Sequence, residues 1–382
     1  MSEQQEERAA PDSVDVAVVG AGPAGLAAAS LCARARFSTA LFDGQSSPGG
    51  HAYRLANHPV AERDSLFGKE YARGAKLVRE FQSSGAHCFQ DSLVTDIKRE
   101  PGPGFLVGSG TRQVKARRII PATGALERPY PIPGSTLPGV AMAGAAQGRF
   151  LADAGQASGE LVLAGCGPLL WLIAWQLFHA GVKIAALLDT TPGGNRALAR
   201  PYFFSYALSP YALKQLRLSR AVRESMKVFD GVSALRAEGD GRLQFVAFAD
   251  DSGKEHRMPA DALLLHQGIA PNAALAMAAG VEHLWDEQQL CFSPVLDHDG
   301  GTSVEGISIA GDAAGIAGAQ AAAWRGVLVA AAVVRKLRPG PAMDPVAKLA
   351  HNALRRFMRG RKYLDLRYRP EDIPGPGVAP AR

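Results

Sequence analysis

The sequence is poor in cysteine and lacks any cysteine pairing motif. Its four cysteines, Cys32, Cys88, Cys166 and Cys291, lie far apart in the 382-residue chain. No two of them have the two-residue spacing of a redox dithiol or a zinc knuckle. We therefore expect neither thiol redox chemistry nor a metal site.

Long apolar runs and an apolar leader are also absent. Among the longest apolar runs are residues 169–175, well short of the ~20 residues that span a bilayer. The start, MSEQQEERAAPDS, is polar and acidic, unlike a secretory signal. We expect no transmembrane helix, a cytoplasmic location and a disordered N-terminus over residues 1–13.

The composition excludes long disorder. Hydrophobic residues make up 47% of the chain and charged residues 20%, and the length allows two or three domains of ~150 residues. Basic residues gather near the C-terminus: residues 335–369 hold eleven of them against two carboxylates, +9 in a chain of net charge +6. This stretch could bind an acidic partner or an anionic membrane surface, or could be a solvated helix face. Few aromatic residues interleave with it, so nucleic acid is not expected.

The strongest motif follows a short β-branched stretch, residues 14–19. Gly20, Gly22 and Gly25 come directly after it and open an alanine-rich helix, which is the context that a dinucleotide-binding turn requires. The glycines permit the tight turn, the approach of a pyrophosphate and close helix packing, and the helix N-terminus attracts the phosphates. A second strand ends in Asp43, where a carboxylate can accept ribose hydroxyls. We predict a dinucleotide site here.

Two distant segments indicate the kind of nucleotide. Residues 117–124 are expected to form a strand ending in Ala122, Thr123 and Gly124, and a later strand leads into Gly311 and Asp312 before a helix of small residues. With these segments the sequence resembles the flavoproteins with two dinucleotide-binding domains, the glutathione reductase-like superfamily. The resemblance implies FAD in the first site. Asp312 would bind the ribityl chain, and the helix start near Gln320 would face the flavin pyrimidine. The residues implied to bind FAD are Gly20, Gly22, Pro23, Ala24, Gly25, Asp43, Gly50, His51, Val94, Ala122, Thr123, Gly124, Gly311, Asp312 and Gln320.

A second, weaker fingerprint repeats the arrangement. A strand at residues 161–164 runs into Gly165 and Gly167, then a long apolar helix, a further strand and a terminal Asp189. Leu170 replaces the third glycine, which should hold the helix away from its strand. If a ligand binds, Asp189 favours NAD or an adenine nucleotide over NADP; the alternative is a vestigial domain kept for its shape. The candidate residues of this second site are Gly165, Gly167, Pro168, Leu169 and Asp189.

The order of these motifs predicts an α/β fold with two Rossmann-like dinucleotide-binding domains, the second inserted in the first. The FAD-binding domain would comprise residues 14–125 and 290–335, and the second, NAD-type domain residues 126–289. Residues 336–382 would form a basic helical tail with a disordered end.

Three further segments carry a narrower resemblance: GALERPYPIPGSTLPGVAMAGAAQ, LVLAGCGPLLWLIAWQLFHAG and IAGDAAGIAGAQAA. They resemble the FAD-containing α-type subunits of multi-subunit amine and amino-acid dehydrogenases. This family includes hydrogen cyanide synthase, opine oxidase, D-hydroxyproline and L-proline dehydrogenases and heterotetrameric sarcosine oxidase. The resemblance implies a partner, an amino-acid-oxidase-like flavoprotein subunit. Larger members add a Cys-rich iron–sulfur domain, but this chain has no Cys after Cys291, so we expect no cluster on it and a small ferredoxin-like [2Fe-2S] subunit instead. Disulfide reductases of this fold need a cysteine pair beside the flavin and are excluded.

His51 is the one candidate catalytic residue. It stands in SPGGHAYR where the resembling proteins usually have Gln, close to the expected flavin ring. A neutral imidazole there could act as a proton partner, or it could simply pack beside the flavin. Tyr53 and Arg54 could line the same cleft.

Three functions remain open from the sequence. The preferred one is the FAD-containing subunit of a complex that oxidises an amine, amino acid or opine and relays electrons through its flavin. The others are a stand-alone NADH-dependent flavin reductase and a non-catalytic nucleotide-binding assembly subunit. The basic tail would suit partner docking, or peripheral contact with the inner face of the membrane.

Overall fold

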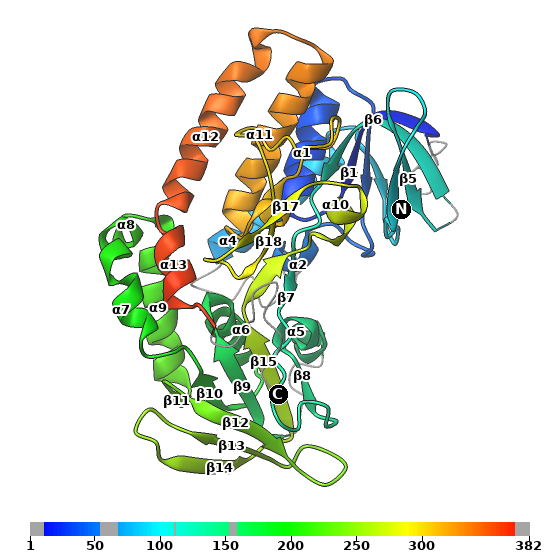
Figure 1. Cartoon of the computed structure of the whole chain (residues 1–382). Coiled ribbons are helices and arrows are strands. Elements are labelled where there is room, and N and C mark those ends of the chain that lie inside the picture. Colours follow the sequence, from blue (N-terminus) through cyan, green and yellow to red (C-terminus); the bar gives the residue numbers. More distant parts are fainter. Residues whose placement is uncertain (1–10, 54–67, 111, 153–158, 371–382) are drawn as a thin grey trace.

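The computed structural model describes residues 11–53, 68–110, 112–152 and 159–370. Two α/β units lie one above the other, each built on a sheet with a parallel core (Figure 1). The predicted fold class, with two Rossmann-like units, is confirmed. The first sheet is drawn from residues 13–121 and the second from residues 140–267. The proposed domain boundaries themselves stay a prediction.

The first sheet has the strand order β3-β2-β1-β6-β5-β4. Its first four strands run parallel, and the last two are antiparallel. Val16, Ala17 and Val18 of the central strand are fully buried, as expected for a parallel strand covered on both faces. The strands are β1 (Ser13–Val19), β2 (Thr39–Phe42), β3 (His87–Phe89), β4 (Asp96–Arg99), β5 (Phe105–Ser109) and β6 (Arg112–Pro121).

The far end of β6 pairs with a segment that returns to this sheet much later in the chain. Ser308 donates its N–H to Ile119 (3.0 Å) and Ala310 donates to Pro121 (2.9 Å), with a parallel bridge between Ile119 and Ile307. The segment leads through η2 (Gly311–Ala314) into α11 (Ala319–Leu337). It therefore pairs like a strand, as predicted, although only isolated bridges form.

Helices α1 (Pro23–Arg34), α4 (Gly68–Gln82) and α11 pack together beside this sheet. Pro23 follows the N-cap Gly22 at the first helical position, where its fixed φ suits a helix start. A Cβ on Gly326 of α11 would lie 2.1 Å from the Ala24 carbonyl oxygen, so only glycine permits this approach. The close packing brings the start of α1 near residues from the end of the chain.

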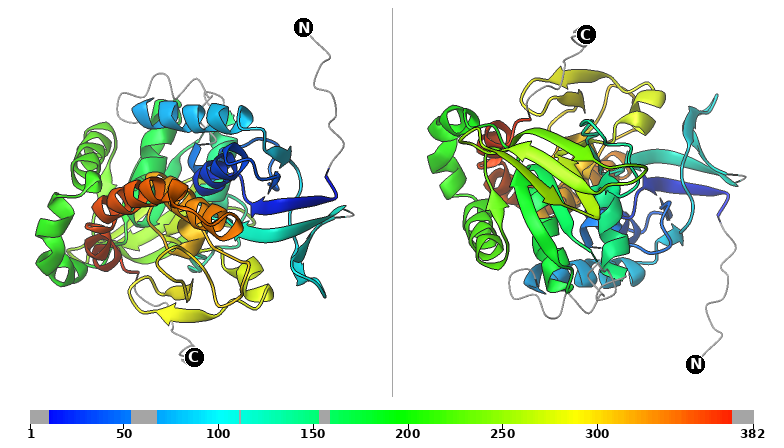
Figure 2. Two further views of the ribbon diagram at one scale, coloured as in Figure 1. Left: turned by 90° about the horizontal axis from the view of Figure 1, so that it is seen from above. Right: turned by 90° about the horizontal axis from the view of Figure 1, so that it is seen from below.

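The second sheet is parallel throughout, in the order β11-β10-β9-β15-β8. An antiparallel three-stranded sheet, β12-β13-β14, lies beside it, as the view from below shows (Figure 2). The parallel strands are β8 (Val140–Met142), β9 (Leu161–Cys166), β10 (Ile184–Asp189), β11 (Val228–Phe229) and β15 (Ala262–Gln267), and the antiparallel ones are β12 (Ser233–Glu238), β13 (Phe245–Ala249) and β14 (Glu255–Pro259). The helices of this unit are α5 (Ala143–Ala152), α6 (Pro168–His179), α7 (Asn195–Ala199), α8 (Phe203–Ala207) and α9 (Pro210–Ser225), with η1 (Arg200–Tyr202) between α7 and α8.

A pair of short strands joins the two units. The chain crosses between them through an antiparallel pair, β7 (Ala125–Glu127) with β16 (Ile269–Pro271). The remaining short elements are α2 (Gly50–Tyr53), α10 (Ala274–Ala278), β17 (His283–Asp286) and β18 (Cys291–Pro294).

The chain ends in two helices, α12 (Asp344–Met358) and α13 (Arg361–Arg367), preceded by η3 (Pro341–Met343). α12 lies along α11, where Leu328, Ala331, Ala347 and Ala350 form a small buried cluster (Figure 2). The helical tail is thus present, and α11 before it continues to Leu337. At the other end, β1 begins at Ser13, the last residue of the predicted N-terminal segment. Residues 1–10 and the expected disordered end, 371–382, lie outside the described residues.

No helix in the described part of the chain has both the length and the apolar character needed to cross a membrane.

Candidate functional site

The loop between β1 and α1 has the backbone geometry of a phosphate-binding turn. Gly20 has φ +104°, and a Cβ on it would lie 2.4 Å from the Ala122 carbonyl oxygen. A Cβ on Gly25 would lie 1.8 Å from the Gly20 oxygen, so the helix start packs directly on the turn. A Cβ on Gly22 would meet no atom within 4 Å. Two glycines are therefore required by the protein's own packing, whereas the third borders open space.

Asp43 holds this loop from the end of β2. Its side chain is buried and accepts hydrogen bonds from the backbone N–H groups of Ala21 and of Gln45, the latter at 2.7 Å. Gly20 also donates to the Phe42 carbonyl (2.7 Å). The carboxylate thus lies beside the turn, as the predicted ribose contact requires.

Val94 follows β3, the strand that pairs with β2 next to Asp43. It is buried in the cluster that holds Phe42 and Phe89, whose rings stack at 4.9 Å. The N–H of Ser92 donates to the Asp43 carbonyl (2.7 Å), which ties this segment to the strand end. These side chains thus form an apolar wall next to the carboxylate that is predicted to bind ribose.

The predicted segment at the end of β6 reaches the same edge of the sheet. Ala122 donates its N–H to the Val19 carbonyl (2.8 Å), and the Thr123 hydroxyl donates to the Asn272 carbonyl (2.8 Å). Gly124 has φ +72°, and a Cβ there would meet no atom within 4 Å. The segment connects the turn of the first site to the crossing between the units.

The Gly311-Asp312 segment closes the site from the other end of the chain. A Cβ on Gly311 would lie 2.6 Å from the Ala24 Cβ. Asp312 accepts hydrogen bonds through Oδ1 from the N–H groups of Ala317 (2.9 Å) and Gly318 (3.1 Å), which shapes the loop before α11. No side chain caps the start of α11.

Gln320 and Arg325, near the start of α11, take part in the walls of the site. Gln320 donates through Nε2 to Glu70 (3.1 Å), which also pairs with Lys214. The sequence did not indicate Arg325, yet its guanidinium donates to the carbonyl of Gly311 (3.1 Å) and to that of Gly315. Burial lowers the pKa of Arg325, with Asp312 opposing the shift. The sequence signal for this role is a single cation in the first two turns of a helix rich in small residues.

His51 lies on α2, next to the turn. Gly49 donates its N–H to the Ala21 carbonyl (2.9 Å), and a Cβ on Gly50 would lie 2.8 Å from the Gly22 Cα. The His51 side chain is exposed, whereas Tyr53 is buried against α4. The structure therefore places His51 beside the first site, and its catalytic role stays a prediction. Arg54 lies outside the described residues.

All predicted first-site residues thus gather along the carboxyl edge of the first sheet, where open α/β sheets bind their ligands. The residues present fit a dinucleotide, because the glycine turn leaves space where a pyrophosphate would lie and Asp43 lies at the adjacent strand end. The described residues contain no group of three or more His, Cys, Asp and Glu side chains arranged to hold a metal.

The second glycine turn lies at the corresponding edge of the second sheet. A Cβ on Gly165 would lie 1.7 Å from the His266 carbonyl oxygen, while a Cβ on Gly167 would meet nothing closer than His266 Nε2 at 3.9 Å. Leu170, in place of the third glycine, is fully buried in the core beneath α6. Pro168 and Leu169 form the first turn of α6. The glycine-only contact that joins Gly25 to Gly20 has no counterpart here.

Asp189 ends β10, and one of its carboxylate oxygens is bonded within the chain. It is only 4% exposed, and its Oδ1 accepts from the Thr191 N–H (2.9 Å) and hydroxyl. Burial raises the pKa of Asp189, and the hydrogen bonds from Thr191 oppose the shift. Residues from the end of the chain lie beside it, since Cys166 donates through Sγ to the Tyr368 carbonyl (3.2 Å). No sequence signal indicated that contact.

A buried pair at the crossing between the units was also not predicted. His266, 1% exposed, contacts Glu127 through Nδ1, and Glu127 accepts the Gly144 N–H (2.8 Å). It links the end of β15 to β7 and to the start of α5.

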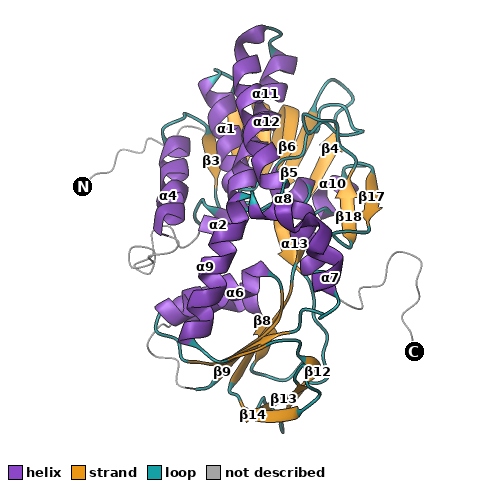
Figure 3. Cartoon of the chain, turned by 90° about the vertical axis from the view of Figure 1, so that its left-hand side faces the viewer, coloured by secondary structure: helices purple, strands orange, loops and turns teal. Residues whose placement is uncertain are grey.

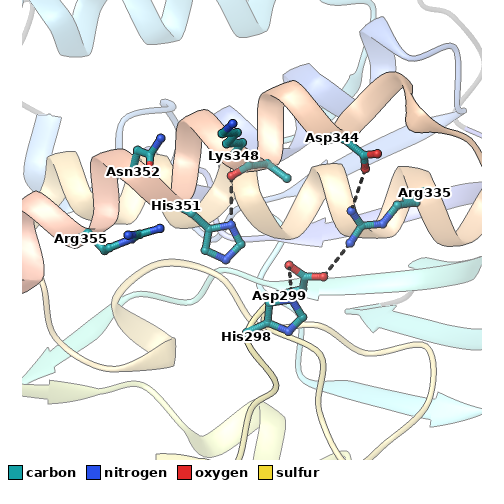
Figure 4. Close-up of a pocket in the computed structure, with 9 residues that line it drawn as sticks. His298, Asp299, Arg335, Asp344, Lys348, His351, Asn352 and Arg355 are labelled. Atoms are coloured by element: carbon teal, nitrogen blue, oxygen red, sulfur yellow. Dashed lines mark hydrogen bonds and ion pairs between the residues drawn. The ribbon is translucent and has the colours of Figure 1, made fainter.

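A further pocket of about 320 Å³ lies outside both nucleotide sites, between α11, α12 and the loop at residue 298 (Figure 4). Arg335 bridges Asp299 (2.7 Å) and Asp344 (3.2 Å) along it. The rings of His298 and His351 are near-parallel at 5.8 Å. These ion pairs use one cation of the basic stretch 335–369, Arg335, in intramolecular packing.

The four cysteines are free in the structure. Burial raises the pKa of Cys32 and of Cys166 to about 12 and that of Cys88 to about 11. The thiols are therefore protonated near neutral pH and poorly nucleophilic.

Comparison with known proteins identifies the family. The profile described as pyridine nucleotide-disulphide oxidoreductase matches residues 14–326. An opine oxidase subunit of Agrobacterium tumefaciens (strain Ach5) is 39% identical over 369 residues, which cover 94% of this chain and 73% of that protein. Hydrogen cyanide synthase subunit HcnB of Pseudomonas aeruginosa is 30% identical over 367 residues, covering 90% of this chain and 76% of that protein. The crystal structure of thioredoxin reductase from T. acidophilum superimposes with a TM-score of 0.64 at 20% identity, covering 85% of this chain and 99% of that one, and so has the same fold.

These matches confirm the resemblance predicted from the sequence. The chain belongs to the pyridine nucleotide-disulphide oxidoreductase family and shares its Rossmann fold and its character as a flavoprotein oxidoreductase.

Proposed function

We propose that the chain is the FAD-containing subunit of a multi-subunit dehydrogenase or oxidase that acts on an amine, an amino acid or an opine. The observation that carries this proposal is the first-site turn, where Gly20 and Gly25 are fixed by packing and Gly22 alone borders open space. The similarity to proteins named as opine oxidase and hydrogen cyanide synthase subunits supports the complex and the substrate class.

The residues that would hold FAD come from four segments of the chain. The N–H groups at the start of α1 would face the pyrophosphate, Asp43 would accept ribose hydroxyls and Val94 would border the adenine. Asp312 would accept a ribityl hydroxyl through the oxygen that does not hold its loop. When bound, the flavin accepts a hydride equivalent or electrons.

The chain's own contribution is positioning and electrostatics. The uncapped start of α11, a 19-residue helix, presents N–H groups and a positive dipole end that favour negative charge on the adjacent ring system. Arg325 fixes the preceding loop through two carbonyl oxygens. Glycine and alanine backbone makes up much of this cradle, so it orients a ring and offers few acid–base groups. Electron relay needs no more than this, and we assign substrate oxidation to a partner subunit.

Exposed apolar side chains in the second unit favour the presence of a partner subunit. Large side chains that should avoid water project from a short stretch of the second unit, and a single domain seldom leaves so many together. We name this surface the α7–α9 patch. Its members are Leu198 (57% exposed), Phe203 (56%), Phe204 (76%), Leu208 (62%), Leu213 (56%) and Leu216 (65%). We propose that it contacts an amino-acid-oxidase-like flavoprotein subunit, with a small ferredoxin-like [2Fe-2S] subunit completing the electron path.

The basic tail would contribute to the same assembly through its outer face. Lys348, Arg355 and Arg356 are exposed on α12, whereas Ala347 and Ala350 pack on α11. Deleting the tail would therefore uncover the face of α11 on which α12 packs. Reversing the charges of these three residues tests docking without disturbing that packing.

The test is to purify the chain with and without a co-expressed candidate flavoprotein partner. We expect FAD to be released on denaturation of the chain in near one-to-one ratio. We also expect amino-acid or opine substrates to bleach the visible flavin band only when the partner is present. A colourless chain that takes up no FAD when supplied, or equally fast bleaching by NADH without any partner, would contradict the proposal.

A further inference from the structure

Residues near the end of the described chain contact the edge of the second sheet, where the second nucleotide site is predicted. In this fold a dinucleotide lies across the ends of the first two strands of the unit, here β9 with its glycine turn and β10 with Asp189. The residue between the two turn glycines, Cys166, is buried and donates through Sγ to the Tyr368 carbonyl (3.2 Å). Residues 361–369, which we name the C-terminal segment, thus reach the glycine turn itself.

Other elements around the crevice hold the same segment. Asn195, in α7 just beyond the end of β10, donates through Nδ2 to the Arg369 carbonyl (2.7 Å). Gln215 of α9 donates weakly to the Tyr368 hydroxyl (3.4 Å). With Cys166, these contacts come from three separate parts of the second unit, and two of them fix the backbone of the segment.

Charge and burial also place the segment against Asp189. Burial raises the pKa of Tyr368, and Asp189 is the next cause of the shift. Arg367 acts in the opposite direction on both Asp189 and Tyr368. The carboxylate that would accept ribose hydroxyls is therefore bonded to Thr191 and flanked by an arginine and a tyrosine of the same chain.

Helix α13 anchors the segment on the outer side of the crevice, against α7 and α8 (Figure 3). The ring of Tyr363 stacks on Tyr206 with centroids 4.3 Å apart and planes 16° apart, and Leu364 is buried. Arg361 pairs with Asp365, which also accepts from Gln289 (3.4 Å) near the first unit. The segment is therefore held at both ends.

We propose that the C-terminal segment is the resident occupant of the second nucleotide crevice, so that NAD or another adenine nucleotide enters only when this segment leaves. The crevice then serves as a peptide-binding surface within the chain. This inference rests on the second unit alone and holds whether or not the first site carries FAD.

The test compares the full chain with Leu364→Asp, which disrupts the packing of α13, and with Tyr368→Ala, which removes the ring that Gln215 contacts. Arg359→Ala, an exposed position between α12 and α13, is the matched control. Isothermal titration measures the binding of NAD⁺ and AMP. Alkylation of Cys166 by N-ethylmaleimide, followed by mass spectrometry, measures access to the glycine turn, with buried Cys32 as an internal reference.

We expect the parent chain and Arg359→Ala to bind neither nucleotide and to protect Cys166. Both crevice variants should alkylate at Cys166 at least about tenfold faster, because opening of the segment exposes the thiol, and should gain nucleotide binding. Nucleotide binding by the parent with Cys166 still protected would overturn the proposal, as would folded variants in which neither quantity changes.

Hydrogen–deuterium exchange on the parent chain gives a readout that does not depend on the variants folding. Backbone amides of residues 361–369 should exchange as slowly as those of α12, and saturating NAD⁺ should leave them unchanged. Complete exchange at the earliest time point would overturn the proposal. Flavin content, recorded on the same samples, reports separately on the first site, so failure of the proposed function can be told apart from failure of this inference.

Discussion

Replacing Gly22 by alanine should weaken flavin binding while leaving the fold intact. Gly22 has φ −73° and ψ −178°, which alanine adopts freely, and a Cβ there meets no atom within 4 Å. At such a position the change stabilises a protein by about 0.4–1 kcal/mol through the unfolded state. The methyl group would occupy the space in which a pyrophosphate approaches the backbone.

Gly25→Ala, in contrast, should destabilise the fold. Its Cβ would lie 1.8 Å from the Gly20 oxygen, a backbone atom that cannot turn aside. Overpacking of this kind costs about 1–3 kcal/mol or more, because the start of α1 must shift. For a unit of about 150–250 residues, each kcal/mol lowers the melting temperature by roughly 2–4 °C.

The assay combines thermal melting of the flavin-free chain with a titration of FAD followed by flavin fluorescence. Gly22→Ala should melt no lower than the parent and raise the Kd of FAD about tenfold or more, which corresponds to about 1.4 kcal/mol of binding free energy. Gly102→Ala, in a loop where a Cβ also meets nothing within 4 Å, is the control: it should likewise melt no lower than the parent, but it should leave the Kd of FAD unchanged. Parent-like affinity in Gly22→Ala, or melting as low as that of Gly25→Ala, would refute the assignment of this space to the phosphates.

Three other perturbations follow from the structure. Phe204→Glu, on the α7–α9 patch, should abolish co-purification with a partner subunit, whereas Leu284→Glu, at an exposed position on β17 (62%), should not; equal retention would remove the patch from the interface. Burial alone would raise the pKa of Asp15, but hydrogen bonds, first among them that from Arg117, hold it below 3.8. The stabilisation from these hydrogen bonds is present above about pH 4 and is lost as the pH falls through the pKa of Asp15 in the folded chain. In Asp15→Asn the melting temperature should therefore fall less steeply at acid pH than in the parent. An equally steep fall would contradict this reasoning. Glu127→Ala removes the carboxylate that contacts buried His266 and accepts the Gly144 N–H. It should lower the free energy of unfolding, measured with denaturant, by about 1–3 kcal/mol. A loss smaller than the experimental error would show that the pair does not stabilise the fold.

The first site could be predicted from the sequence because its chemistry is local. Gly20, Gly22, Gly25 and Asp43 lie in one strand–turn–helix–strand stretch, in which spacing alone places each residue. The pairing of Asp312 with that stretch came from resemblance, since nothing local brings together residues so far apart in the chain. The structure adds the reason, which is that β6 offers its free edge to residues 306–310.

The second site shows where sequence reasoning ends. The glycine turn and Asp189 lie at the ends of β9 and β10, and Leu170 takes the position of the third glycine; their role in binding a nucleotide stays a prediction. The contact between Cys166 and Tyr368 joins positions about two hundred residues apart and depends on how α13 packs. The basic composition of the tail indicated docking to a partner or a membrane surface, or a solvated helix face, whereas its apolar minority, such as Leu364 and the ring of Tyr363, determines where it lies.

The pairing of residues 306–310 with β6 also determines when the first site can be completed during synthesis of the chain. A ribosome makes the chain from its N-terminus, so the glycine turn and Asp43 emerge early, and the segment that completes the cradle at Asp312 emerges only after the whole second unit. Until then the edge of β6 beyond Ala116 has no partner from this segment, and the nascent chain cannot enclose a flavin. Coenzyme loading is therefore a late event, and a chain truncated before residue 306 should be released colourless and with an unpaired strand edge.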